Sequence, residues 1–107
     1  MIGGPELRRL RGDSPGPTLI LVGGVHGNEP LGIAAASRAI EEARANRVAI
    51  AGEVILFAGN RPALAEGRRY LERDFNRAWT PALVNAARAA GERETDPELR
   101  ALAELAD

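Results

Sequence analysis

Residues 23–30, with the sequence GGVHGNEP, hold the one histidine of the chain and a glutamate three residues after it. An imidazole and a carboxylate at this spacing can reach a single cation, and zinc accepts both kinds of ligand. Catalytic zinc sites usually combine three protein ligands with a water molecule, so His26 and Glu29 predict two of the three. The alternative is a solvent-facing loop histidine beside a glutamate that caps a helix.

A second polar cluster spans residues 69–77, whose sequence is RYLERDFNR. Its adjacent Asn76 and Arg77 could bind a carboxylate, because a guanidinium donates two parallel hydrogen bonds and the amide adds another donor. Arg69 could polarise a carbonyl group bound nearby. The alternative is an ordinary charged loop, in which the acidic residues pair with neighbouring arginines.

The segments around the histidine predict a strand, a helix and a second strand. Residues 18–22, TLILV, are apolar and β-branched, which is typical of a central strand in a covered sheet. Residues 31 to 44 have apolar side chains at helical spacing, and Pro30 suits the first turn. Residues 53–59, EVILFAG, predict the second buried strand. This order is typical of a covered, largely parallel α/β sheet.

Sheets of this kind bind ligands at the carboxyl ends of their strands. His26 and Asn60 each follow a predicted strand, so parallel strands would bring them to the same edge. The remaining predictions are a lead-in strand or loose arm at 1–17, one helical turn at 62–66, an irregular segment at 67–79, and helices at 81–91 and 98–106, the last capped by Thr95 or Asp96. Long irregular segments in compact domains are often functional.

The composition fits one domain at most and argues against several classes of protein. The 107 residues include 14 basic and 15 acidic groups, a net charge of −1, which argues against a nucleic-acid-binding surface. All of the basic residues are arginine, so one arginine is weaker support for function here than elsewhere. No apolar stretch is long enough to span a membrane, and the N-terminus lacks the apolar core of a signal peptide. We therefore expect no nucleic-acid or membrane partner and a cytoplasmic location.

Taken together, the two polar motifs resemble the succinylglutamate desuccinylase/aspartoacylase family of the zinc carboxypeptidase-like superfamily. The resemblance rests on His-Gly-Asn-Glu at 26–29, a strand ending at Asn60, Arg-Tyr at 69–70 and Asp-Phe-Asn-Arg at 74–77. Two such motifs in this order are far more specific than either one alone. The family implies a three-layer α/β sandwich with a mostly parallel or mixed sheet and flanking helices, of which this chain would be a truncated part.

The resemblance also implies a role for each matching residue. His26 and Glu29 would bind Zn²⁺, and Arg69 would stabilise the negative charge that develops on the substrate's carbonyl oxygen. Asn76 and Arg77 would bind a carboxylate of an amino-acid substrate. In the family, water activated by zinc attacks the amide bond of an N-acyl amino acid, with a glutamate as general base. The implied partner is therefore a small N-acyl amino acid.

The chain departs from the family in what it lacks. The family's third zinc ligand is a second histidine, which is absent here, and the general base cannot be located. Family members are much longer, so we expect residues 1–107 to be the N-terminal part of a catalytic domain and to be inactive alone. A truncated sheet would leave an unpaired edge, which favours self-association.

A competing interpretation is a non-catalytic α/β module that binds a carboxylate or a metal ion through the same residues. The missing ligand and base favour it if the chain is complete. Histidine and carboxylate ligands favour zinc, but they also admit manganese, iron or cobalt.

Overall fold

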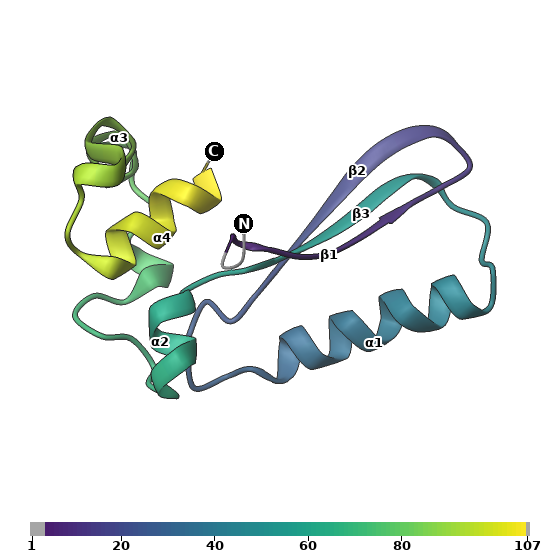
Figure 1. Ribbon diagram of the computed structural model, residues 1–107, viewed down its shortest axis with the longest axis horizontal. Coiled ribbons are helices and arrows are strands. Elements are labelled where there is room, and N and C mark those ends of the chain that lie inside the picture. The colour runs from purple at the N-terminus through teal and green to yellow at the C-terminus, as the bar shows by residue number, and fades with distance from the viewer. Residues whose placement is uncertain (1–3, 107) are drawn as a thin grey trace.

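The computed structural model describes residues 4–106, so residues 1–3 of the predicted lead-in and residue 107 lie outside the described part. Three strands form one sheet in the order β1-β3-β2. They are β1 (Glu6–Arg11), β2 (Ser14–Gly23) and β3 (Ala51–Ala58). Figure 1 shows helix α1 (Leu31–Ala45) running along the sheet and the other helices gathered at one end of it.

The predicted strand–helix–strand unit is confirmed. β2 and β3 are parallel, with residues 18–23 opposite residues 53–58, and α1 connects the two strands. β1 pairs antiparallel with β3, so the sheet is mixed. Beyond the strand ends, the backbone N–H of Asn60 donates to the carbonyl of Gly24 over 2.9 Å. His26 and Asn60 therefore start from the same edge of the sheet, as predicted.

The prediction that residues 18–22 form a central strand is wrong, because β2 lies at the edge of the sheet and β3 at its centre. Within residues 4–106, no strand pairs with the outer edge of β2. Leu19 and Ile20 are consequently 55% and 58% exposed. An apolar run predicts burial on both faces, but burial requires a neighbouring strand and a covering layer that the described residues do not supply.

Three short helices follow β3, and each begins at a side chain that accepts a hydrogen bond from the first helical turn. They are α2 (Arg61–Glu66), capped by Asn60, α3 (Pro81–Ala90), capped by Thr80, and α4 (Pro97–Ala106), capped by Asp96. Two short 3-10 turns, η1 (Phe75–Arg77) and η2 (Gly91–Arg93), complete the chain. The three predicted helical segments are thus confirmed. None of the described helices is long and apolar enough to cross a membrane.

A small apolar core lies between η1 and α4. It consists of buried Phe75, Ala78, Ala101 and Leu102, with partly buried apolar side chains around them. The rings of Phe75 and Trp79 meet edge-to-face, with their centroids 6.1 Å apart. Because Phe75 is fully buried, it holds its chain neighbours Asp74 and Asn76 in place at the surface of this core.

The two faces of the sheet are covered unequally. α1 covers the face that includes Gly23, where an added β-carbon would meet the Ile33 side chain at 2.6 Å. The opposite face carries Ile20 and Val22, and it borders a hollow of about 450 Å³ whose other walls include Trp79 and the end of α4. The predicted α/β class is therefore confirmed as a small mixed sheet with flanking helices, and the three-layer sandwich stays a prediction.

Candidate functional site

His26 lies on a tight loop between β2 and α1 that glycines allow to pack closely. The loop turns at Gly24, whose φ of +71° is rarely adopted by residues with a β-carbon. At Gly27 a β-carbon would come within 2.2 Å of the backbone of Ala63, so only glycine fits. The backbone N–H of Gly27 also donates to the carbonyl of Arg69 over 3.0 Å. The loop is therefore fixed against α2 and against the segment that carries the second motif.

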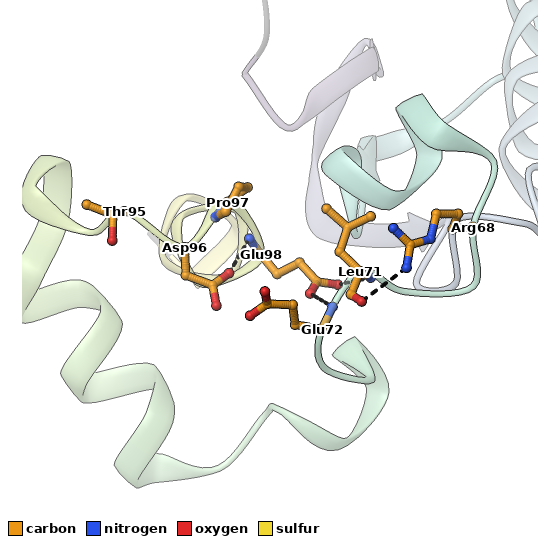
Figure 2. A pocket seen from close by; sticks show the side chains of 7 residues that line it. All are labelled: Arg68, Leu71, Glu72, Thr95, Asp96, Pro97 and Glu98. Atoms are coloured by element: carbon orange, nitrogen blue, oxygen red, sulfur yellow. Dashed lines mark hydrogen bonds between the residues drawn. The ribbon is translucent and has the colours of Figure 1, made fainter.

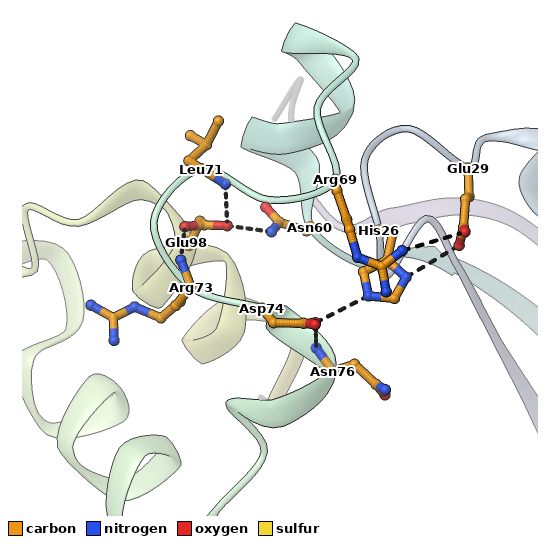
Figure 3. Close-up of polar contacts among 9 residues, drawn as sticks. All are labelled: His26, Glu29, Asn60, Arg69, Leu71, Arg73, Asp74, Asn76 and Glu98. Carbon is orange, nitrogen blue, oxygen red and sulfur yellow. Dashed lines mark hydrogen bonds and ion pairs between the residues drawn. The ribbon is translucent and has the colours of Figure 1, made fainter.

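The imidazole of His26 lies between two carboxylates, as Figure 3 shows. Its Nδ1 is 3.2 Å from Oε2 of Glu29, and its Nε2 is 3.0 Å from Oδ1 of Asp74. The histidine side chain is 13% exposed, whereas that of Glu29 is 62% exposed. One ring nitrogen thus faces the protein, and the other faces a carboxylate that is open to solvent.

The spacing between His26 and Glu29 fits two ligands of one zinc ion. With bonds of roughly 2.0 to 2.1 Å and a tetrahedral angle, two ligand atoms lie roughly 3.3 to 3.4 Å apart. The distance from Nδ1 to Oε2 is 3.2 Å. Asp74 on the other nitrogen would fix the ring orientation, as carboxylates behind histidine ligands do. Within residues 4–106, however, no three His, Asp or Glu side chains form a group that could hold the ion by themselves.

Asp74 is held in its ionised form. Partial burial opposes ionisation, but hydrogen bonds from His26 and from the backbone N–H of Asn76, with the charge of Arg69, keep the pKa of Asp74 below its usual value. An ionised Asp74 favours the histidine tautomer that donates from Nε2. That tautomer leaves Nδ1 with a lone pair directed toward Glu29, where it could bind a cation.

Of the other predicted site residues, the structure brings Arg69 nearest to this pair. Its Nη1 lies 3.8 Å from Oε1 of Glu29, and its side chain is 52% exposed. Asn76 and Arg77 lie on η1, directly after Asp74, and both are exposed. No residue in the described part of the chain hydrogen-bonds either side chain, so both present donors to solvent beside the His26 loop.

Two residues that shape the site are missing from the sequence-based prediction. Asp74 lies inside the second motif, but there the pattern indicates only an acidic partner for arginine. Glu98 is 1% exposed and accepts hydrogen bonds from the backbone of residues 71–73. Its place in the sequence indicates an acidic residue in the first turn of a helix, which is usually exposed. No local pattern predicts its burial.

Comparison with known proteins identifies relatives. Residues 15–106 match the succinylglutamate desuccinylase/aspartoacylase catalytic domain. The chain is 35% identical over 77 residues to a succinylglutamate desuccinylase of Pseudomonas aeruginosa (strain LESB58), a match that covers 72% of this chain and 23% of that protein. With a succinylglutamate desuccinylase of Yersinia pseudotuberculosis serotype O:3 (strain YPIII), the identity is 32% over 62 residues, covering 58% and 19%. The chain thus spans less than a quarter of the length of these curated relatives. No solved structure matches it.

Proposed function

This chain belongs to the succinylglutamate desuccinylase/aspartoacylase family, and we propose that it is the N-terminal part of a catalytic domain that uses zinc to hydrolyse the amide bond of an N-acyl amino acid. The activity is proposed for the whole protein, because the chain spans only 23% of the length of a Pseudomonas relative. The observation that carries the proposal is the pair His26 and Glu29, whose facing atoms are 3.2 Å apart with Asp74 behind the ring.

We assign His26 and Glu29 as two of the zinc ligands. The chemistry that zinc supplies when bound is polarisation of a carbonyl group and activation of a water molecule. Asp74 holds the imidazole by its Nε2, so that Nδ1 keeps one orientation toward Glu29. This arrangement also supports zinc over a harder cation, because magnesium and calcium prefer sites built from oxygen ligands alone.

The arginines and Asn76 supply the groups that would bind the substrate. Arg69 is close enough to the ligand pair for its guanidinium to donate to a carbonyl oxygen as negative charge develops there. Asn76 and Arg77 are exposed and adjacent on η1, so they can bind the carboxylate of the amino acid together. The substrate would then be fixed at two points, its carboxylate and its amide carbonyl.

Hydrolysis by this chain alone is not expected. The sequence has one histidine, so a second histidine ligand must come from residues outside it. A general base beside the bound carbonyl is also required, and general bases typically contribute about 10²- to 10⁴-fold to the rate. A cytoplasmic location stays a prediction.

The test is metal binding by the purified chain, measured by cobalt(II) absorbance and by the zinc content after dialysis. We expect His26→Ala to abolish binding and Glu29→Gln to weaken it at least tenfold, in line with the loss of a ligand. Glu66→Gln is the matched control, because Glu66 is also exposed and lies on the adjacent helix α2. Measurable binding that is equal in wild type and His26→Ala would refute the assignment of His26 as a ligand.

The second candidate is a non-catalytic module that binds a carboxylate or a metal ion. The observation that favours it is the exposure of Asn76 and Arg77 next to a ligand pair that lacks a third member. A longer protein that binds an N-acyl amino acid but never releases the free amino acid would support the module. Release of the amino acid, lost in Arg69→Ala with binding retained, would support the enzyme.

We also propose that the chain self-associates through the outer edge of β2. Within residues 4–106 this edge is unpaired, and Leu19, Ile20 and Val22 on it are exposed. Unpaired edges and apolar patches favour association. Sedimentation over a range of concentrations tests this, with Ile20→Lys expected to shift the chain toward the monomer. A wild-type chain that stays monomeric at all concentrations would contradict the proposal.

A further inference from the structure

The carboxylate of Glu98 is buried without a basic partner in the described part of the chain. Glu98 lies in the first turn of α4 and is 1% exposed. It accepts four hydrogen bonds: from the backbone N–H of Leu71 (3.0 Å), Glu72 (2.7 Å) and Arg73 (3.1 Å), and from Nδ2 of Asn60 (2.5 Å). Figure 2 shows its side chain reaching from α4 to the backbone of the neighbouring segment. Glu98 also lines a polar hollow of about 600 Å³.

This bonding pattern satisfies a segment that has no regular secondary structure. Residues 71–73 lie between α2 and η1, so no helix or strand accepts their N–H groups. Unpaired backbone donors are costly when buried, and three N–H groups pointing at one place form a natural site for an anion. Here the anion is supplied by the protein itself. Burial opposes ionisation, yet the hydrogen bonds from Glu72, Leu71 and Asn60 outweigh it and keep the pKa of Glu98 below its usual value.

The three amides that Glu98 binds lie between residues of the proposed site. Arg69 precedes them by two positions, and Asp74, which holds the ring of His26, follows them directly. Asn60, the fourth donor, caps α2, and α2 packs against Gly27 of the histidine loop. In Figure 3 these contacts form a continuous path from Glu98 through the backbone of residues 71–74 to His26.

We propose that Glu98 is a positioning residue, whose buried carboxylate fixes residues 71–73 and thereby places Arg69 and Asp74 around His26. The inference deepens the proposed function and rests on it for what the placed residues do. A side chain required only to fill space there would be better served by an apolar residue, since a buried carboxylate is costly unless each oxygen is satisfied. Both oxygens of Glu98 are satisfied, each by two donors.

Glu98→Gln tests the proposal because it keeps the shape of the side chain and removes its charge. Glu104→Gln is the matched control, since Glu104 lies on the same helix and pairs with Arg61 at a more exposed position. In Glu98→Gln we expect the amide hydrogens of residues 71–73 to exchange faster than in wild type. This acceleration should be at least tenfold larger than the acceleration at residues 101–103. In the control we expect no such difference.

The single histidine provides a second readout, because its ring gives one set of nitrogen-15 signals. We expect these signals to move in Glu98→Gln and not in Glu104→Gln, since only the first change releases Asp74 from its position. Cobalt(II) affinity should fall roughly 10- to 100-fold, the usual effect of losing a group that orients a ligand. Glu98→Asp, which keeps the charge on a shorter side chain, should recover part of each effect.

An equal change in exchange at all amides, with the histidine signals unmoved, would overturn the proposal, because it would show a purely global role. Unchanged exchange at residues 71–73 would overturn it as well. If Glu98→Gln does not fold, hydrogen exchange in the wild-type chain still tests the inference. The amides of residues 71–73 must be protected to a similar degree as those of α4, and unprotected exchange at residues 71–73 refutes the inference. Failure of the wild-type chain to bind cobalt(II) would count against metal binding by His26 and Glu29 in this chain and not against the inference about Glu98, since the exchange and ring signals need no metal.

Discussion

Glu29 and Glu98 both contact residues within 69–73, and their carboxylates have contrasting surroundings. The Glu29 side chain is 62% exposed and faces the side chains of His26 and Arg69. Glu98 is 1% exposed, and three of its four donors are backbone N–H groups. The exposed carboxylate has acceptor capacity left for a ligand, whereas the capacity of the buried one is occupied by the protein. Glu29 is therefore suited to binding a ligand, whereas Glu98 supports the residues that bind it.

The largest expected effect on stability comes from truncating Glu98, the buried one of the two carboxylates. Glu98→Ala should lower the free energy of unfolding by about 3 to 5 kcal/mol, because it leaves three backbone donors and the Asn60 amide without their acceptor. Chemical denaturation measures this. Glu29→Ala, by contrast, should change the same quantity by less than about 0.5 kcal/mol. Similar losses in the two variants would remove the distinction between them.

A smaller effect is expected where the histidine loop packs against α2. Gly27→Ala would place a β-carbon 2.2 Å from the Ala63 backbone and should lower the free energy of unfolding by about 1 to 3 kcal/mol. It should also weaken metal binding, because the loop carries His26. Gly32→Ala is the control, since a β-carbon there meets nothing within 4 Å, and it should be neutral or stabilising by up to about 1 kcal/mol. Equal tolerance of both changes would show that the loop is not fixed as described.

The pH dependence of stability should also distinguish the buried carboxylate. Because the pKa of folded Glu98 is below its usual value of 4.5, its contribution is complete above pH 4.5 and is lost as the pH falls through the lower folded value. Wild type should therefore lose stability on acidification more steeply than Glu98→Gln, which has no proton to bind there. Denaturation curves between neutral pH and acid measure the two slopes. Parallel slopes would show that Glu98 does not titrate as proposed.

The smallest effect on stability is expected at Glu29, the exposed carboxylate, where the change should act selectively on metal binding. Glu29→Gln should leave the free energy of unfolding within about 0.5 kcal/mol of wild type and weaken metal binding at least tenfold. Glu98→Gln should reduce both quantities. Calorimetric metal titration of the same samples that are used for denaturation gives the two numbers together. A loss of stability in Glu29→Gln would mean that this carboxylate also supports the fold.

The parts of the structure that could be predicted from sequence are those set by short-range patterns. The run at 18–22, the helical spacing after Pro30 and the second apolar run predict a strand–helix–strand unit, and parallel pairing then places His26 and Asn60 at one edge. A helix cap at Thr95 or Asp96 follows from polar residues just before an apolar helical pattern, and the structure shows that Asp96 is the cap. Each strand and helix here is set by residues within it or directly beside it, and the parallel pairing of the two strands follows from the helix that connects them.

The features that could not be predicted depend on distant partners. The edge position of β2 is decided by which strands are present to pair with it, and the apolar sequence of residues 18–22 contains no such information. Glu98 meets residues 71–73 across 25 to 27 positions of sequence, so its burial follows from the packing of α4 and from no pattern near it. His26 and Asp74 are 48 positions apart, which is why the second motif alone gives no sign of their contact.

The large separation in sequence between Glu98 and residues 71–73 affects the order in which this chain folds. Residues 71–73 have no partner for their N–H groups until α4 has docked, so we expect the motif residues around them to reach their final places late in folding. Contacts that form after the transition state affect the unfolding rate more than the folding rate. Stopped-flow kinetics should then show Glu98→Gln unfolding faster while folding at nearly the wild-type rate, and a slower folding rate would place the docking of α4 early instead.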